Sequence, residues 1–178
     1  MNIVLIGYRA SGKTTIGKLL ARELNLDFVD IDHRIMARYG NLSVAEIWEQ
    51  FGEPSYRETE CDVTEQACAG CNQVIALGGG TPMQARAFAA LEAAQDATHF
   101  FLHAAAETLY ARSQIDAANA ANRPSLTSIG GGLDEVRHML AQREPVYKKL
   151  ADHTIDVDHQ SLAAAAAEIA RIAKSQRE

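Results

Sequence analysis

The chain has 178 residues, of which 47% are hydrophobic and 22% charged, the composition of an ordinary globular domain. Its formal net charge of −6 argues against a nucleic-acid partner, because nucleic-acid-binding domains usually present a basic face. No apolar run approaches the roughly 20 residues that span a bilayer, and the N-terminus lacks the pattern of a signal peptide. We therefore expect one cytoplasmic domain over residues 1–178 with no membrane partner. We also expect a monomer.

Five short runs rich in Val, Ile, Leu or Phe predict buried parallel strands at residues 2–6, 28–29, 73–77, 99–102 and 154–157. The segments between them predict helices at residues 13–24, 43–51, 54–69, 85–94, 105–113, 134–150 and 161–174. Ser43 and Glu46 have the spacing of a capping box, and Pro54 suits the first turn of a further helix. Strands that alternate with helices predict an α/β fold in three layers, with helices on both faces of a parallel sheet.

Residues 7–14 match the pattern G-x-x-x-x-G-K-[ST] in full, with an apolar strand before it and a helix after it. Backbone N–H groups of such a loop surround phosphate oxygens, and the helix N-terminus adds positive charge. Lys13 is placed to reach the β- and γ-phosphates, and the Thr14 hydroxyl to ligate Mg²⁺. The expected nucleotide-binding residues of this loop are Gly7, Ala10, Ser11, Gly12, Lys13, Thr14 and Thr15.

Asp30 and Asp32 come directly after the second predicted strand. Ligands of an open α/β sheet bind outside the carboxyl ends of the strands, so both carboxylates should lie beside the phosphate loop. Alternating residues at a strand end could then serve a metal and an acceptor hydroxyl. The alternative is that Asp32 only caps the following helix.

Other candidate residues lie further along the chain. Glu60 follows Arg57 by three positions, so it can hold the guanidinium across one helical turn, although a plain surface ion pair fits the same spacing. The glycines at 78–80 follow the third strand and let the backbone approach a ligand. Arg123 and Arg143 suit a phosphate or carboxylate, which arginine binds in a bidentate manner.

The ordered set of G-x-x-x-x-G-K-T, Asp30-x-Asp32, Tyr56-Arg57-x-x-Glu60, the triple glycine, Arg123-Pro124 and Arg143-x-x-x-Tyr147 resembles the shikimate kinase family. The match runs from residue 2 to about residue 158. It implies ATP- and Mg²⁺-dependent phosphorylation of the shikimate 3-hydroxyl to shikimate 3-phosphate, a step toward chorismate and the aromatic amino acids. It also implies a five-stranded parallel sheet like that of nucleoside monophosphate kinases. A shikimate-binding region at about 31–70 and a mobile lid at about 114–130 belong to the same pattern.

The resemblance assigns roles residue by residue. Lys13, Asp32 and Arg123 would be catalytic, with Arg123 reaching the transferring phosphoryl group from the lid. Asp30 would stand near Mg²⁺ together with Thr14. The shikimate contacts would come from Asp32, Arg57, Gly78, Gly79, Gly80 and Arg143, and Arg112 would stack on the adenine.

Two positions depart from the family pattern. Ala10 stands where many members have glycine, which matters if the loop needs a positive φ there. Tyr56 replaces the more usual phenylalanine.

Two other functions share part of this pattern. A gluconate-type kinase would need the phosphate loop and a lid, but not two arginines facing one carboxylate. A nucleotide-binding switch would need the loop without Asp32, Arg57 or Arg143. An assay with ATP and shikimate, run beside gluconate, separates the three.

Overall fold

The computed structural model describes residues 1–115 and 132–176. In these ranges five strands form one parallel sheet in the order β2-β3-β1-β4-β5. The strands are β1 (Asn2–Ile6), β2 (Asp27–Asp30), β3 (Gln73–Ala76), β4 (Ala97–His103) and β5 (His153–Asp156). The fold class predicted from the sequence is confirmed.

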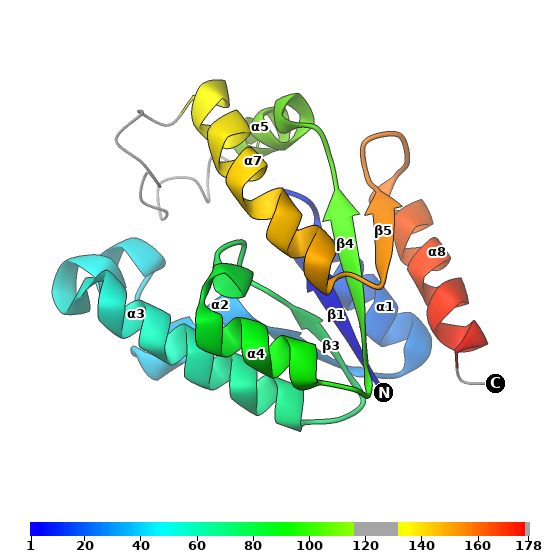
Figure 1. The fold of residues 1–178 in the computed structure, drawn as a ribbon, viewed down its shortest axis with the longest axis horizontal. Helices are drawn as coiled ribbons and strands as arrows, with labels where there is room; N and C mark the ends of the chain where they lie inside the picture. Colours follow the sequence, from blue (N-terminus) through cyan, green and yellow to red (C-terminus); the bar gives the residue numbers. More distant parts are fainter. Residues whose placement is uncertain (116–131, 177–178) are drawn as a thin grey trace.

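Helices cover both faces of the sheet (Figure 1). They are α1 (Lys13–Leu24), α2 (Ile31–Arg38), α3 (Val44–Ala69), α4 (Ala85–Ala93), α5 (Ala106–Ile115), α7 (Leu133–Leu150) and α8 (Leu162–Ser175), with a 3-10 turn η1 (Thr81–Met83). Successive side chains of a strand point to opposite faces, so Ile3 and Leu5 pack with α1 and α8 whereas Val4 and Ile6 pack with α2, α3 and α4.

The helix α3 contains a break that the sequence predicts. Its capping box is present, because the Ser43 N–H donates to Glu46 Oε2 at 2.7 Å and the Glu46 N–H donates to Ser43 Oγ at 3.3 Å. Gly52 has a φ of 82°, and the helix resumes around Pro54. The two helices predicted over residues 43–51 and 54–69 are therefore present, as two helical segments of α3 that meet at a kink at Gly52.

The helix α2 was not predicted, and it changes the place of Asp32. Asp30 is the last residue of β2 and the N-cap of α2, where its Oδ1 accepts the His33 N–H at 3.3 Å. Asp32 lies in the first turn of α2. The idea of two carboxylates alternating at a strand end was wrong, and so was the alternative of Asp32 as the cap. The carboxylates are separated by the start of a helix.

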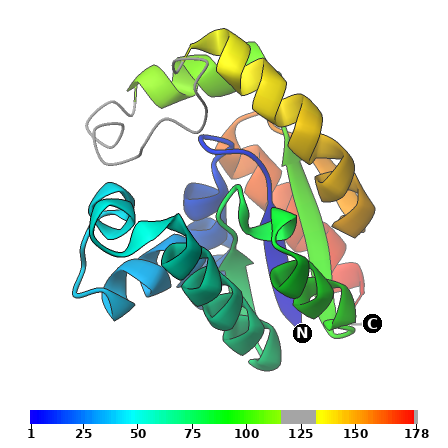
Figure 2. The same ribbon diagram turned by 60° about the vertical axis from the view of Figure 1, so that its left-hand side comes forward.

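The parallel register brings the segments that follow β1, β2 and β3 to one edge of the sheet. In Figure 2 the turn after β1 (blue) lies between α3 (cyan to green) and α7 (yellow to orange). The predicted lid at 114–130 and its Arg123 lie outside the described residues, apart from Gln114 and Ile115 at the end of α5. None of the helices in the described ranges is long and apolar enough to cross a membrane.

Candidate active site

The loop between β1 and α1 has the backbone of a phosphate-binding turn. Gly12, the N-cap of α1, has a φ of 93°, and a Cβ there would come within 2.7 Å of a Leu162 methyl group. Ala10 has a φ of 62°. The position where the family pattern more often has glycine therefore does need the left-handed conformation, and alanine adopts it at an energetic cost.

Lys13 lies in the first turn of α1 with its ammonium over this loop. Its Nζ donates to the carbonyls of Gly7 and Tyr8, both at 2.8 Å, and to Ser11 Oγ at 3.4 Å. A fixed ammonium beside the positive end of a helix suits the phosphates of a nucleotide. The residues present therefore fit ATP on this side of the site.

Thr14 and Asp30 are brought together as the sequence predicts. The Thr14 hydroxyl donates to Asp30 Oδ2 at 2.9 Å, while the other oxygen of Asp30 caps α2. A hydroxyl and a carboxylate at this distance, beside the phosphate loop, are the oxygen ligands that Mg²⁺ takes in phosphoryl-transfer sites. Both side chains reach solvent, so the pair fits Mg²⁺ with part of its water shell.

A pocket next to the phosphate loop gathers residues from five segments, and we call it the acceptor pocket. Its lining comes from the loop after β1, from α2 and α3, from the turn after β3, and from α7. The lining residues are Arg9, Asp32, Val44, Trp48, Tyr56, Arg57, Glu60, Gly78, Gly79, Gly80 and Arg143. All the sequence-predicted shikimate contacts lie here.

Arg57 is held by a buried carboxylate. Its guanidinium pairs with Glu60 at 2.8 Å and with Glu53 at 3.1 Å, and Glu60 is 1% exposed. Burial raises the pKa of Glu60, while the charge of Arg57 and a 2.6 Å hydrogen bond from Thr81 oppose the rise. Burial also works to lower the pKa of Arg57, but Glu60 outweighs it and the net pKa is raised. The ion pair is thus part of the pocket wall and not a surface pair.

Arg143 lines the same pocket from α7. Its guanidinium carbon lies 5.6 Å from the centre of the Tyr8 ring, and Arg9 lies at the same distance from that ring. The buried Nε atoms of Arg9 and Arg143 have no hydrogen-bond partner among the described residues. Two unsatisfied guanidinium N–H groups beside the Arg57 cation favour an anionic ligand.

The glycines of the turn after β3 have different roles in the pocket. A Cβ at Gly78 would come within 2.8 Å of Asp32 Oδ1, 2.9 Å of Thr81 Oγ1 and 3.0 Å of Glu60 Oε1, so this glycine has a packing reason. A Cβ at Gly79 would meet nothing closer than 3.4 Å, and the Gly79 carbonyl accepts the Tyr147 hydroxyl at 2.5 Å. Gly79 therefore fits the predicted role of an open approach to a ligand.

The predicted adenine contact, Arg112, lies on α5 near the segment that follows β5. Arg112 of α5 donates to the Val157 carbonyl at 2.6 Å, directly after β5. Leu162, at the start of α8, contacts Gly12. Arg112 therefore joins α5 to the segment after β5, Leu162 places the start of α8 beside the phosphate loop, and the contact of Arg112 with adenine stays a prediction. Thr15 is exposed in the first turn of α1, beside Thr14.

Reasoning from the sequence missed Arg9, Val44 and Trp48. Arg9 occupies a position of the phosphate motif where any residue is allowed. The only feature that could have indicated it is its positive charge in a chain that is acidic overall. Trp48 is the single tryptophan of the chain and lies 5.5 Å from the Arg57 guanidinium carbon, beyond the bend of α3. No spacing rule relates it to Arg57 across a break in the helix.

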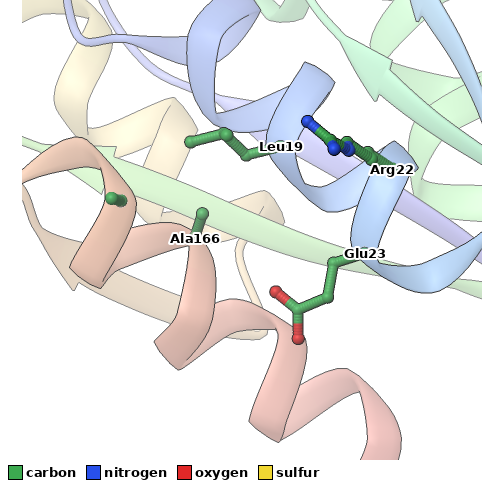
Figure 3. A pocket seen from close by; sticks show the side chains of 5 residues that line it. Leu19, Arg22, Glu23 and Ala166 are labelled. Atoms are coloured by element: carbon green, nitrogen blue, oxygen red, sulfur yellow. The ribbon is translucent and has the colours of Figure 1, made fainter.

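A second hollow lies between α1 and α8, lined by Leu19, Arg22, Glu23, Ala163 and Ala166 (Figure 3). It holds none of the predicted site residues and only one charge of each sign. The acceptor pocket is the candidate site because Asp32 and the predicted anion-binding residues Arg57 and Arg143 converge there.

A family model described as shikimate kinase matches residues 9–174. The chain belongs to the shikimate kinase family. A shikimate kinase of Symbiobacterium thermophilum is 39% identical over 169 residues, which cover 95% of this chain and 94% of that protein. One of Oleidesulfovibrio alaskensis is 37% identical and covers 96% and 95%.

Solved structures agree with membership of the shikimate kinase family. A shikimate kinase from Acinetobacter baumannii in complex with shikimate has a TM-score of 0.87 at 30% identity, covering 98% of this chain and 93% of that one. A gluconokinase from Sinorhizobium meliloti has a TM-score of 0.57 at 19% identity, which shows a common fold alone. The family uses ATP with Mg²⁺ and serves aromatic amino acid biosynthesis.

Proposed function

We propose that this chain transfers the γ-phosphoryl group of ATP to the 3-hydroxyl of shikimate, giving shikimate 3-phosphate and ADP. The observation that carries the proposal is the acceptor pocket, where Arg57 and Arg143 enter from α3 and α7 with Asp32 in the same lining. Shikimate has one carboxylate and three hydroxyls, so it needs an anion clamp and a hydroxyl acceptor on one rigid frame.

On the acceptor side, Arg57 and Arg143 hold the shikimate carboxylate in charge-assisted pairs. The Glu60 partner fixes the Arg57 guanidinium before the ligand arrives, which lowers the cost of ordering it. The open Gly79 backbone gives the ring room. Asp32 accepts hydrogen bonds from the hydroxyls and takes the proton of the attacking one.

On the donor side, Lys13 and the backbone N–H groups of the loop bind the phosphates and oppose the charge that spreads over the transferring group. Gly7, Ala10, Ser11 and Gly12 shape this loop, and Thr15 extends it into α1. Thr14 and Asp30 would hold Mg²⁺, which when bound neutralises phosphate charge. Arg112 would stack on the adenine.

The proposal also covers the larger regions of the chain, the lid, and the state and location of the protein. Residues 31–70 form the shikimate-binding region, and residues 114–130 the lid that excludes water from the site. Arg123, within that segment, contacts the transferring phosphoryl group. We propose that the protein acts as a cytoplasmic monomer without nucleic-acid or membrane partners.

A coupled assay that follows ADP release tests the function. The protein is incubated with ATP and Mg²⁺ and with either shikimate or gluconate, and a third sample receives no acceptor. We expect turnover with shikimate alone. Turnover with gluconate alone would replace the proposal with a sugar-acid kinase, and binding of ATP without turnover in any sample would leave a nucleotide-binding module.

A further inference from the structure

Tyr56 lies in the wall of the acceptor pocket with its hydroxyl directed at the proposed base. It is 4% exposed, on α3, and its hydroxyl donates to Asp32 Oδ1 at 3.3 Å. Its ring is fixed edge-on against Trp48, with centroids 6.1 Å apart, and Arg57 lies 5.4 Å from the ring centre. Because Trp48 and Arg57 both contact the Tyr56 ring, the Tyr56 hydroxyl is held in one direction, toward Asp32.

A donor to Asp32 has a clear electrostatic effect here because a second carboxylate lies close by. Asp32 Oδ1 and Glu60 Oε1 both face the Cα of Gly78, where a Cβ would come within 2.8 Å of one and 3.0 Å of the other. Glu60 receives hydrogen bonds from Arg57 and Thr81. Asp32 receives the Tyr56 hydroxyl. The two carboxylates are therefore held by different donors despite their repulsion.

The Tyr56 hydroxyl remains a hydrogen-bond donor at neutral pH. Burial raises the pKa of Tyr56 far above its ordinary value, and the negative charges of Asp32 and Glu60 raise it further. The phenol therefore stays protonated and keeps its hydrogen for Asp32. It does not compete with Asp32 for the substrate proton.

We propose that Tyr56 is a positioning residue for the phosphoryl acceptor: its hydroxyl holds one oxygen of Asp32, so that the carboxylate meets the substrate hydroxyl in a single orientation. The inference rests on the proposed function and adds a residue to it. The hydroxyl is also what distinguishes Tyr56 from the phenylalanine that the family pattern more usually places here. The Tyr56 ring packs in the wall of the acceptor pocket, and the Tyr56 hydroxyl orients the Asp32 carboxylate.

The test is Tyr56→Phe, which keeps the ring and removes the donor. Steady-state rates are measured with shikimate and with ATP varied, and are counted per site that binds nucleotide, so that incomplete folding does not lower the apparent kcat. We expect kcat to fall about fivefold to tenfold, as for the loss of an ordinary hydrogen bond, because the Tyr56–Asp32 contact is long at 3.3 Å. The KM for shikimate and the KM for ATP should each change less than about twofold.

Tyr39→Phe is the matched control. The Tyr39 hydroxyl makes hydrogen bonds with Ser55 and Thr59 on the same helix, away from the acceptor pocket. Tyr39 is the C-cap residue of α2, so this variant reports what the loss of a tyrosine hydroxyl that bonds to α3 does to the fold. We expect it to change thermal stability with kcat unchanged.

The same change in an Asp32→Asn background separates positioning from packing. If the hydroxyl acts through the Asp32 carboxylate, Tyr56→Phe should lower the residual kcat by less than about twofold there. An equal fall in both backgrounds overturns the proposal, as does an unchanged kcat in the single variant or a rise in the shikimate KM that exceeds the fall in kcat. Absence of shikimate-dependent turnover in the wild type would instead overturn the proposed function.

Discussion

The donor side and the acceptor side of this site are built in opposite ways. The phosphate loop is one stretch of eight residues that runs from the end of β1 into the first turn of α1, and the contacts of Lys13 are local: its ammonium reaches back to carbonyls five and six residues away. The acceptor pocket takes its lining from segments as far apart as Arg9 and Arg143. A local loop can occur in many proteins, whereas the pocket exists only when the whole sheet edge is assembled. The donor side therefore indicates phosphoryl transfer, and the acceptor side determines which molecule receives the phosphoryl group.

The largest effect is expected on the donor side, from Lys13→Ala. Removal of the ammonium takes a cation away from the transferring group, and we expect kcat to fall by at least about 100-fold. The fold should survive because Lys13 belongs to a loop site and not to either core cluster. The measurement is the coupled assay together with a thermal melt. Nearly normal turnover in a folded variant would contradict the role of the phosphate loop.

Asp32→Asn probes the boundary between the two sides. The amide keeps the shape and removes the proton acceptor, so we expect kcat to fall about 100-fold with a much smaller change in the shikimate KM. Initial rates at varied shikimate and saturating ATP check this. A change confined to KM would make Asp32 a binding group only.

Arg143→Ala is the clean test of the carboxylate clamp. Loss of one charge-assisted pair should raise the shikimate KM about tenfold to 100-fold and leave the ATP KM unchanged. Titration of the variant with each ligand separately gives the result. Weakened ATP binding with normal shikimate binding would assign Arg143 to the donor side.

Arg57→Ala should behave differently, because Arg57 is also the partner of the buried Glu60. Its loss leaves a carboxylate unpaired in the wall, so we expect the shikimate KM to rise and the unfolding free energy to fall by about 2–3 kcal/mol. Arg57→Lys should not restore binding, because lysine has no planar fork. A chemical denaturation curve beside the kinetics distinguishes the two effects, and Arg57→Ala with Glu60→Gln should recover stability but not affinity.

The smallest effect is expected at Ala10, in the phosphate loop. Ala10→Gly removes the strain of alanine at a φ of 62°, worth roughly 1 kcal/mol, and adds freedom to the unfolded chain that offsets part of it. We expect a rise of about 1–2 °C in the thermal midpoint, with kcat within twofold. A lower midpoint would mean that the loop is not strained there.

The contrast between the two sides also explains what the sequence could predict. The bounds of β1 and α1 and the residues of the phosphate loop follow from a contiguous pattern, and the structure places them as expected. The family pattern also indicated Asp32, Arg57, Arg143 and the glycines, which the structure brings into one pocket. Their roles in catalysis and binding stay predictions.

The elements that were not predicted depend on tertiary packing. The helix α2 is eight residues long with only Ile31 and Ile35 buried, too weak a pattern to stand out beside its charged residues. Arg9 and Trp48 join the pocket through the bend of α3 and the turn after β1, which no local spacing encodes. The packing role of Gly78 appears only when Asp32, Glu60 and Thr81 surround it.

The strand order has a consequence for how the site can open. β1 has a hydrogen-bonded neighbour on each side, whereas β2 is an edge strand that pairs with β3 alone. Local opening begins at the least supported elements, so amide protons of β2 and of the helices beyond it should exchange with solvent sooner than those of β1. A molecule opened in this way would still carry an intact phosphate loop but no acceptor pocket. Opening of this kind would remove the acceptor residues, and Asp30 with them, before it disturbs the backbone of the phosphate loop.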